Sequence, residues 1–368
     1  MSNSHNFWST QPIKVGEGNG TIQVPEEIRK EPIKLPDPFV FKTFNFEKDI
    51  NALYLLLKEN YVEDLASDFR LEYSRDFLAW QLNDPKAKPE YAVCLLHQTK
   101  LVGFALGKEL ILCVSDKVEN FLSVNFLCID RNLRNQRLAP VIIQELTRRA
   151  NLNGIFHAIF TSGKKLPFDF ASSRYYHRPI NTKKLIDVEF CVKPEDENEM
   201  IEYFQINYKI RPGIRQMQNG DLPKVFELYK QECKKYDLYQ VYDFKDFEYN
   251  FKNRENIFYT YVNEEEGEIK EFFSFFVINS LLVKDLRIKV KTAYIFYYST
   301  DNTTTIMQEM ISEAKNQGCD LVNSLLIMKN ELFLEDLNFL PGNGVLNYYF
   351  FNWKTKSIEN EKIFFILP

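Results

Sequence analysis

The chain has 368 residues, 45% hydrophobic and 26% charged, so it is long enough to bury the cores of two ordinary domains. Its formal net charge of −5 argues against a general nucleic-acid-binding protein, which carries a basic surplus. No apolar run reaches the length of a membrane span, and the six cysteines are scattered without a Cys-x-x-Cys pair. We therefore expect a soluble, cytoplasmic protein with reduced thiols and no metal site.

The first forty residues are polar and contain five prolines, which predicts an extended arm on the surface of a domain. Regular structure is expected to begin near Phe39. Residues 49–62 carry apolar side chains at helical spacing. Strands are expected at 39–46, 90–96, 100–106, 111–115, 121–129 and 156–163.

The segment after the strand at 121–129 has the features of an anion site. A loop with three arginines follows the strand, and an amphipathic helix is expected to begin at Pro140. Backbone N–H groups and the helix dipole favour anions at a helix N-terminus, and the arginines add charge. The spacing Arg134-x-x-Arg137-x-Ala139 resembles the pyrophosphate loop of the N-acetyltransferase superfamily, which implies a CoA thioester.

From residue 210 onward the order of predicted elements repeats. A strand, a short acidic turn and an amphipathic helix come first, followed by a strand pair, a further strand, a helix and a last strand. The later elements are expected at 258–263, 272–278, 292–300, 303–318 and 319–327. Strands alternating with helices predict an α/β fold, and the shared order indicates a weak internal duplication.

Six segments, in order along nearly the whole chain, resemble the signature blocks of the N-myristoyltransferase (glycylpeptide N-tetradecanoyltransferase) family. They are HNFWSTQP (5–12), ENYVED (59–64), NFLCIDRNLRNQRLAP (125–140), TRRANLNGIFHAIFTSG (147–163), RYYHRPINTKKLI (174–186) and YYFFNW (348–353). The resemblance implies two tandem acetyltransferase-like (GNAT-type) domains with pseudo-twofold symmetry and a mixed twisted sheet flanked by helices. It also implies an arm at 1–37, an acyl-CoA-binding domain at 38–206 and a peptide-binding domain at 207–368.

The reaction that the family catalyses moves a tetradecanoyl group from CoA to the α-amine of an N-terminal glycine. Myristoyl-CoA is then a co-substrate, and no cofactor is bound permanently. The resemblance implies that the arm, the strand end and the basic loop hold the acyl-CoA. The corresponding residues are Asn6, Phe7, Trp8, Phe126, Leu127, Cys128, Ile129, Arg134, Asn135, Arg137, Leu138 and Ala139.

The resemblance assigns catalysis to the strand end and to the chain terminus. The backbone amides of Phe126 and Leu127 correspond to the oxyanion hole, and their side chains are expected in the core. Asn125 precedes them, and because asparagine is depleted in strands it marks either a local break or a buried bond to a neighbouring strand. The family uses its terminal α-carboxylate as the base, here that of Pro368, and Thr161 corresponds to a residue beside the glycine amine.

The substrate groove rests on the resemblance alone. Its corresponding residues are Tyr61, Glu63, Asp64, Phe69, Tyr175, His177, Ser274, Tyr294, Asn343 and Gly344. Two departures remove carboxylates: Leu65 and Ala66 stand where the family continues with acids, and Asn343 replaces the aspartate of a Gly-Asp-Gly motif. We therefore expect a weaker requirement for a basic residue downstream of the substrate glycine.

Two other functions stay open at this point. One is another CoA-dependent N-acyl- or acetyltransferase, and the other is a catalytically silent adaptor that binds acyl-CoA or peptide. The expected partners are Gly-initiated peptides or proteins and myristoyl-CoA, without nucleic acid and without insertion into a membrane. The protein is expected to act as a monomer.

Overall fold

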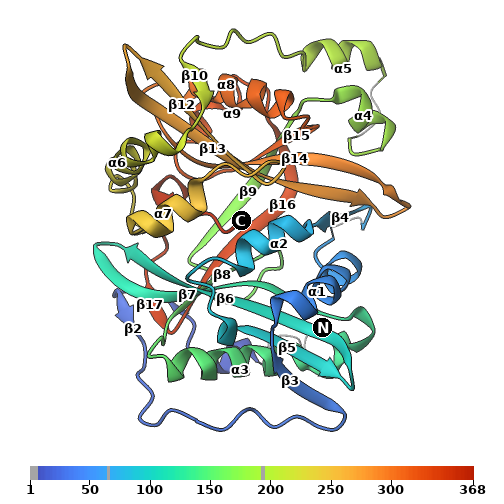
Figure 1. The fold of residues 1–368 in the computed structure, drawn as a ribbon, viewed down its shortest axis with the longest axis vertical. Helices are drawn as coiled ribbons and strands as arrows, with labels where there is room; N and C mark the ends of the chain where they lie inside the picture. The colour runs from blue at the N-terminus through green and yellow to red at the C-terminus, as the bar shows by residue number, and fades with distance from the viewer. Residues whose placement is uncertain (1–6, 64–66, 192–194) are drawn as a thin grey trace.

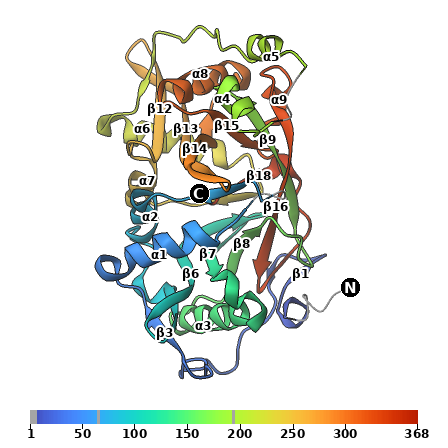
Figure 2. The same cartoon turned by 90° about the vertical axis from the view of Figure 1, so that its right-hand side faces the viewer.

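The computed structural model describes residues 7–63, 67–191 and 195–368, and it consists of two stacked halves (Figure 1). Most of the blue-to-green chain forms the lower half and most of the yellow-to-red chain forms the upper half, although two green helices lie at the top and red strands reach into the lower half (Figure 1). The C-terminus lies near the middle of the molecule in both views, between the halves (Figure 2). The end of the chain is therefore placed where both halves reach it.

The first 203 residues contain the elements of the arm and of the lower half, together with the helices at 182–187 and 197–203, which lie in the upper half (Figure 1). The strands are β1 (Lys14–Val15), β2 (Gly20–Thr21), β3 (Phe39–Thr43), β4 (Phe69–Glu72), β5 (Ala92–His97), β6 (Lys100–Val114), β7 (Lys117–Ile129), β8 (Ala158–Ser162) and β9 (Ala171–Pro179). The α-helices are α1 (Phe46–Asn60), α2 (Arg75–Leu82), α3 (Leu138–Leu152), α4 (Thr182–Asp187) and α5 (Glu197–Tyr203). Short 3-10 turns cover Trp8–Thr10, Pro89–Tyr91 and Arg131–Gln136.

The second half follows the same order of strands and helices. Its strands are β10 (Ile214–Gln216), β11 (Leu238–Gln240), β12 (Phe258–Glu265), β13 (Glu268–Leu282), β14 (Asp285–Ser299), β15 (Leu321–Leu325), β16 (Leu340–Phe351), β17 (Trp353–Thr355) and β18 (Ile363–Phe364). Its α-helices are α6 (Leu222–Cys233), α7 (Phe244–Phe251), α8 (Thr303–Asn316) and α9 (Glu331–Leu334), with 3-10 turns at Asn219–Asp221 and Asn360–Lys362.

Local sequence accounts for most of these boundaries. Helix α1 begins after Asn45, whose side chain accepts the Lys48 N–H, and it buries Leu53, Leu56 and Leu57 at helical spacing. The strands expected at 100–106 and 111–115 form one continuous strand, β6, because its residues stay almost wholly buried along the whole run. The expected helix start at Pro140 was wrong by two residues, since α3 begins at Leu138.

The two halves share one mixed sheet. Its path runs β10-β12-β13-β14-β15-β9-β16-β8-β7-β6-β11-β18. Strand β9 of the first half pairs with β15 of the second, whereas β16 of the second half pairs with both β8 and β9. Each half therefore completes the sheet of the other, and the internal duplication is built as an exchange of strands.

The expected surface arm forms a small three-stranded sheet with β17, separate from the large sheet. Strands β1 and β2 both pair with β17, and farther along the Ile33 N–H donates to Glu145 on α3. The main hydrophobic core, by contrast, joins side chains of both halves, as in the edge-to-face pair of Phe77 with Trp80, which itself packs on Phe258. The halves are thus held together by a common core as well as by the shared strands.

Candidate active site

The centre of the candidate site is a β-bulge near the end of β7. Phe104 pairs with Cys128 and Leu106 with Asn125, so Phe126 and Leu127 lie opposite the single residue Ala105. Phe126 has φ +54°, a left-handed conformation that a phenylalanine adopts only when its surroundings impose it. The local break expected at Asn125 is therefore present.

Asn125 connects the bulge to the end of the chain. Its Oδ1 accepts the Phe126 N–H at 2.8 Å, and its Nδ2 donates to a main-chain oxygen of Pro368 at 2.7 Å. The Tyr61 hydroxyl lies 3.5 Å from the same Oδ1. A half-buried amide thus brings together two residues that are more than two hundred positions apart in the sequence. The Phe126 side chain is buried, as expected, and Leu127 is half-buried.

The chain reaches Asn125 through a buried apolar tail. Ile363, Phe364 and Phe365 have no exposed surface and Ile366 is 7% exposed, which agrees with the apolar sequence of this segment. Pro368 itself is half-buried. The tail therefore delivers its last residue into the interior, between the two halves.

The basic loop and the start of α3 form the second part of the site. Arg137 adopts φ +57° at the N-cap of α3 and makes no side-chain capping bond, so the first N–H groups of α3 are left without a side-chain acceptor. Asn135 and Arg137 are exposed, Leu138 is buried and Ala139 is half-buried. Arg134 is anchored instead, because its guanidinium donates to the Asn60 carbonyl oxygen. This end of the helix has the properties of an anion site.

Aromatic side chains form a stack beside β8. Trp8 stacks on Phe160 with ring centroids 5.3 Å apart, and Phe160 stacks on Tyr349 at 5.1 Å. Phe7 meets Trp8 edge to face. The arm therefore packs against the sheet through aromatic rings, whereas Asn6 lies outside the described residues.

Three further residues expected at the site lie near the bulge, two on β7 directly after it and one on the neighbouring strand β8. Cys128 is buried with its thiol 3.9 Å from the Leu56 carbonyl oxygen, and burial raises the pKa of that thiol to about 12. Ile129 packs in the smaller core with α3. Thr161 on β8 is half-buried and pairs with Tyr348 of β16. Cys128 and Ile129 thus support the strand through packing.

Tyrosines gather on the side of the bulge that faces the second half. Tyr61 packs on Tyr73 and Phe126, and Tyr294 stacks on Phe276. Burial raises the pKa of Tyr61, Tyr73 and Tyr175, and it raises the pKa of Tyr294 to about 12. These phenols are therefore neutral hydrogen-bonding groups, and none of them serves as a base at neutral pH.

His177 lies on the shared strand β9, tightly packed against β16. Its Nδ1 is 2.6 Å from Asn323 Oδ1, and a Cβ added to Gly342 would come within 2.2 Å of its Nε2. Burial lowers the pKa of His177, while the Asn323 hydrogen bond opposes that shift. Asn343 and Gly344 follow in an exposed irregularity of β16, where pairing with β9 is interrupted between Pro341 and Val345.

Three other expected groove residues bond to or pack against residues of the protein itself. The Glu63 carboxylate accepts two bonds from the buried Arg70 guanidinium, at 2.9 and 2.5 Å, and these outweigh burial to lower the pKa of Glu63. Phe69 is buried against Phe190. Ser274 is buried, and its hydroxyl bonds to the backbone of Tyr297. Asp64 and the neighbouring Leu65 and Ala66 lie outside the described residues.

Within the described ranges 7–63, 67–191 and 195–368, no three His, Cys, Asp or Glu side chains come close enough together to hold a metal ion. Across the same residues, none of the helices combines the length and the apolar composition that crossing a membrane requires.

The fold defines the class of the protein first. A GCN5-related N-acetyltransferase from Anabaena variabilis has a similar structure, with a TM-score of 0.50 at 12% identity over 85% of this chain and 72% of that chain. Two tandem acetyltransferase-like halves and a mixed twisted sheet flanked by helices were expected, and this expectation is confirmed.

The family follows from the closer comparisons. The family models "Myristoyl-CoA:protein N-myristoyltransferase, N-terminal domain" and "C-terminal domain" match residues 20–173 and 187–363. The glycylpeptide N-tetradecanoyltransferase of Plasmodium falciparum is 35% identical over 99% of this chain and 93% of its own length. The chain therefore belongs to the N-myristoyltransferase family, as its six signature segments indicated.

Further relatives and a solved structure agree with this membership. The Saccharomyces cerevisiae glycylpeptide N-tetradecanoyltransferase is 35% identical over 96% of this chain and 87% of its own length, and a Bos taurus relative is 36% identical over 99% and 76%. A crystal structure of the Saccharomyces cerevisiae N-myristoyltransferase with bound myristoyl-CoA has a TM-score of 0.93 at 31% identity, with both chains covered completely.

Several residues at the site were not identified from the sequence. Tyr297 and Tyr348 contact the buried tail, Asn323 pairs with His177, and Phe160 and Tyr349 stack beneath Trp8. Each lies inside an apolar strand, where an aromatic or amide side chain looks like ordinary core. The one available signal was the density of aromatic residues in 292–300 and 348–353.

Proposed function

We propose that the protein transfers a tetradecanoyl group from tetradecanoyl-CoA to the α-amine of an N-terminal glycine. The observation that carries the proposal is the Asn125 side chain, which bonds both the Phe126 N–H of the bulge and the Pro368 oxygen. An electrophile held at the bulge therefore lies close to a basic group at the chain terminus. Membership of the N-myristoyltransferase family supports this substrate pair.

We assign the acyl-CoA to the first half of the molecule. The N-terminus of α3, with Asn135, Arg137, Leu138 and Ala139, offers backbone N–H groups and positive charge to the CoA phosphates. Phe7 and Trp8 of the arm, packed over β8, would cover the acyl-CoA. The matching yeast N-myristoyltransferase was crystallised with bound myristoyl-CoA, which agrees with this assignment.

The bulge is assigned to the thioester carbonyl. In the structure the Phe126 N–H donates to Asn125 Oδ1, so the thioester oxygen would take over that donor and add the Leu127 N–H. A preorganised donor of this kind lowers a barrier by roughly 2.7–4 kcal/mol. Because the donors belong to the backbone, the Phe126 side chain contributes packing, and Phe126→Leu should be mild.

The base is assigned to the carboxylate of Pro368. An α-amine with a pKa of roughly 7.7–8 and an α-carboxyl near 3.3–3.7 differ by about 4 units, or about 6 kcal/mol. Removal of the carboxylate from water narrows that gap. The substrate ammonium gives one proton to the carboxylate, and the amine nitrogen bonds to the thioester carbon. The C–S bond then breaks, and the CoA thiolate takes the second proton from nitrogen.

The peptide is assigned to the second half and to the seam between the halves. Thr161 faces the glycine amine, and Tyr61, Tyr175, His177 and Tyr294 form the groove. The arm is then 1–37, the acyl-CoA domain 38–206 and the peptide domain 207–368, although strands β9 and β16 are exchanged between them. We propose that the enzyme acts as a monomer in the cytoplasm.

The test is turnover with tetradecanoyl-CoA and a Gly-initiated octapeptide, measured as release of CoA thiol. We expect thiol release with this pair, and little with acetyl-CoA or with a peptide whose glycine amine is acetylated. Faster turnover with acetyl-CoA would make the protein an acetyltransferase. Tight binding of tetradecanoyl-CoA without thiol release would make it an adaptor.

A further inference from the structure

The last four residues of the chain leave regular structure before they reach the site. Strand β18 ends at Phe364, after pairing in parallel with β11 through Ile363 and Phe364. Residues 365–368 belong to no strand or helix. Their path into the site must therefore come from other contacts.

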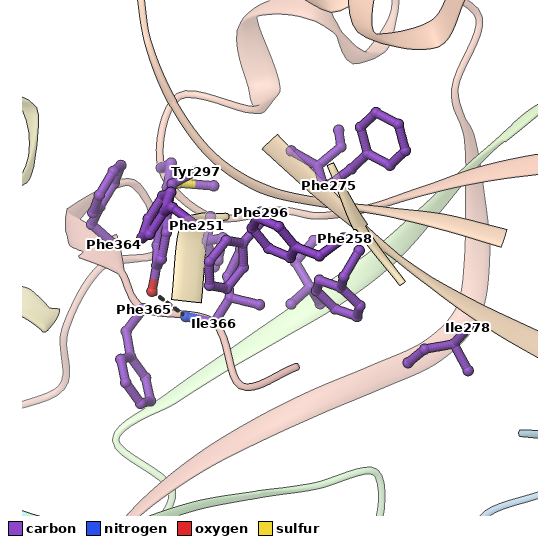
Figure 3. Close-up of a cluster of buried hydrophobic side chains, with 14 of the residues drawn as sticks. Phe251, Phe258, Phe275, Ile278, Phe296, Tyr297, Phe364, Phe365 and Ile366 are labelled. Carbon is purple, nitrogen blue, oxygen red and sulfur yellow. Dashed lines mark hydrogen bonds between the residues drawn. The ribbon is translucent and has the colours of Figure 1, made fainter. Parts of the chain in front are cut away.

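Three side chains from three different strands bond to this final segment. The Tyr348 hydroxyl of β16 lies 3.4 Å from the Phe365 carbonyl oxygen, and the Tyr297 hydroxyl of β14 accepts the Ile366 N–H at 3.1 Å. Asn125 of β7 donates to Pro368 at 2.7 Å. Of these three bonds, only that of Tyr297 joins a buried hydroxyl to a buried main-chain N–H (Figure 3).

The Tyr297 side chain is itself held firmly in place. Its ring has no exposed surface, stacks on Phe364 with centroids 4.6 Å apart and lies 4.1 Å from Phe296. Its backbone is bound on both sides by one hydroxyl, because Ser274 Oγ donates to the Tyr297 carbonyl at 2.8 Å and accepts its N–H at 3.2 Å. Tyr297 is therefore fixed to β13 through its backbone, and its hydroxyl accepts a hydrogen bond from the tail.

We propose that Tyr297 is a positioning residue for transfer, whose hydroxyl holds Ile366 so that the Pro368 carboxylate reaches the substrate amine. The proposal rests on the function proposed above. The chain from the Ile366 N–H to the carboxylate comprises only Ile366, Leu367 and Pro368, a span of at most about 10 Å, so movement of Ile366 also moves the carboxylate. A displacement of about 1 Å at a reacting group is enough to reduce a rate by roughly 10²-fold.

The test compares Tyr297→Phe with Tyr298→Phe. Each removes one hydroxyl from a buried tyrosine on β14, but the Tyr298 hydroxyl bonds to Asn330 Oδ1 at 2.8 Å instead of to the tail. We expect Tyr297→Phe to reduce kcat about 10-fold with the KM of both substrates changed less than about 2-fold, because misplacement of the base affects only the chemical step. Tyr298→Phe should leave kcat and KM near those of the parent protein.

A second measurement does not depend on activity. Hydrogen exchange of the peptide 363–368 should be roughly 10-fold faster in Tyr297→Phe than in Tyr298→Phe, because the Ile366 N–H loses its acceptor. Equal exchange and equal kcat in the two variants would overturn the positioning role. If the tail exchanges faster in Tyr297→Phe but kcat is unchanged, the tail is held by Tyr297 without consequence for transfer, and the proposal fails.

Failure of the proposed function has a different signature. A parent protein that releases no thiol from tetradecanoyl-CoA, or that keeps its rate when residues are added beyond Pro368, overturns the proposed transfer or its base. A parent protein that is active and sensitive to such an extension, with Tyr297→Phe as active as Tyr298→Phe, overturns only the role of Tyr297.

Discussion

The two halves of the molecule contain the same bulged hairpin with different polar partners. In the first half Phe126 and Leu127 lie opposite Ala105, and in the second half Phe296 and Tyr297 lie opposite Ser274. Ser274 bonds both backbone groups of Tyr297, which closes the second bulge. Ala105 has no such group, so the first bulge bonds to its own strand through Asn125.

The two helices that follow these hairpins also differ in the polar groups at their N-termini. Helix α3 begins at a left-handed Arg137 without a side-chain cap, after a basic loop. Three residues separate helix α8 from β14, and Asn302 caps the helix by accepting the Thr305 N–H at 3.1 Å. One half thus bonds its bulge through the amide that also contacts the chain terminus and leaves its helix end without a side-chain cap, while the other bonds its bulge through Ser274 and caps its helix through Asn302.

Among single substitutions, the largest expected effect comes from Asn125→Ala. We expect kcat to fall roughly 10²-fold, because the Pro368 oxygen loses its donor and the proposed base is no longer held beside the bulge. The free energy of unfolding should change by less than about 1 kcal/mol, since these bonds are only partly buried. Steady-state kinetics and urea unfolding on the same preparation measure both effects.

The matching change in the closed bulge is Ser274→Ala. It leaves two buried backbone groups of Tyr297 without a partner, so the free energy of unfolding should fall by about 1–3 kcal/mol. The effect on kcat should be smaller than that of Asn125→Ala, and the KM for the peptide should not change. A raised peptide KM at unchanged stability would instead place Ser274 in the groove.

The next effect concerns the two helix ends. Arg137→Gly should raise the KM for tetradecanoyl-CoA roughly 10-fold, because one charge-assisted phosphate contact is lost. It should also raise the melting temperature, because glycine adopts φ +57° without strain. Asn302→Ala is the control: it should reduce stability by about 1 kcal/mol and leave this KM unchanged. An equal rise of KM in both variants would contradict the assignment of CoA to the first half.

A smaller effect is expected for the substrate lysine. Changing a lysine downstream of the substrate glycine to alanine should alter kcat/KM little in the parent protein. Asn343→Asp adds a carboxylate at an exposed position, and an exposed ion pair of about 0.2–1 kcal/mol corresponds to a gain of up to roughly 5-fold for the lysine peptide. A large loss with the alanine peptide in the parent protein would show that other acids already bind the lysine.

The smallest effect is the pH dependence of stability. Burial lowers the pKa of His177 and of His157, so the native state binds fewer protons than the unfolded state below about pH 6.5. Stability should therefore rise with pH up to about 6.5 and then level off. His177→Gln at the seam and His157→Gln in the first half should each reduce this slope in urea unfolding at pH 5–7. An unchanged slope in both variants would contradict burial of the neutral imidazoles.

Sequence patterns were sufficient for the hairpins β5–β6 and β12–β13, for helix α3 and for the repeated order, because each follows from local periodicity. The unusual Asn125 in an apolar strand also signalled the first bulge. The second bulge gave no such signal, since Ser274 is an ordinary residue in a buried strand. Contacts such as Tyr297 with Ile366 or His177 with Asn323 join distant segments, and no local pattern encodes them.

The exchange of β9 and β16 was likewise beyond local reasoning. The polar sequence of β9, ASSRYYHRP, and the mixed sequence of β16 do not indicate which half either strand joins, and only tertiary pairing decides its neighbour. The same exchange brings His177, Asn343 and Thr161 to the seam between the halves. The candidate groove is therefore a product of the topology, although the sequence named many of its residues.

The most direct test of the account is to move the terminal carboxylate. Two glycines added after Pro368 should reduce kcat by roughly 10²-fold or more, because the base can no longer lie beside Asn125. The same two glycines inserted after Gly267, in the exposed turn between β12 and β13, are the matched control and should leave kcat near that of the parent protein. An unchanged kcat in the extended chain would contradict the account, because the bulge of the first half would then work without the chain terminus.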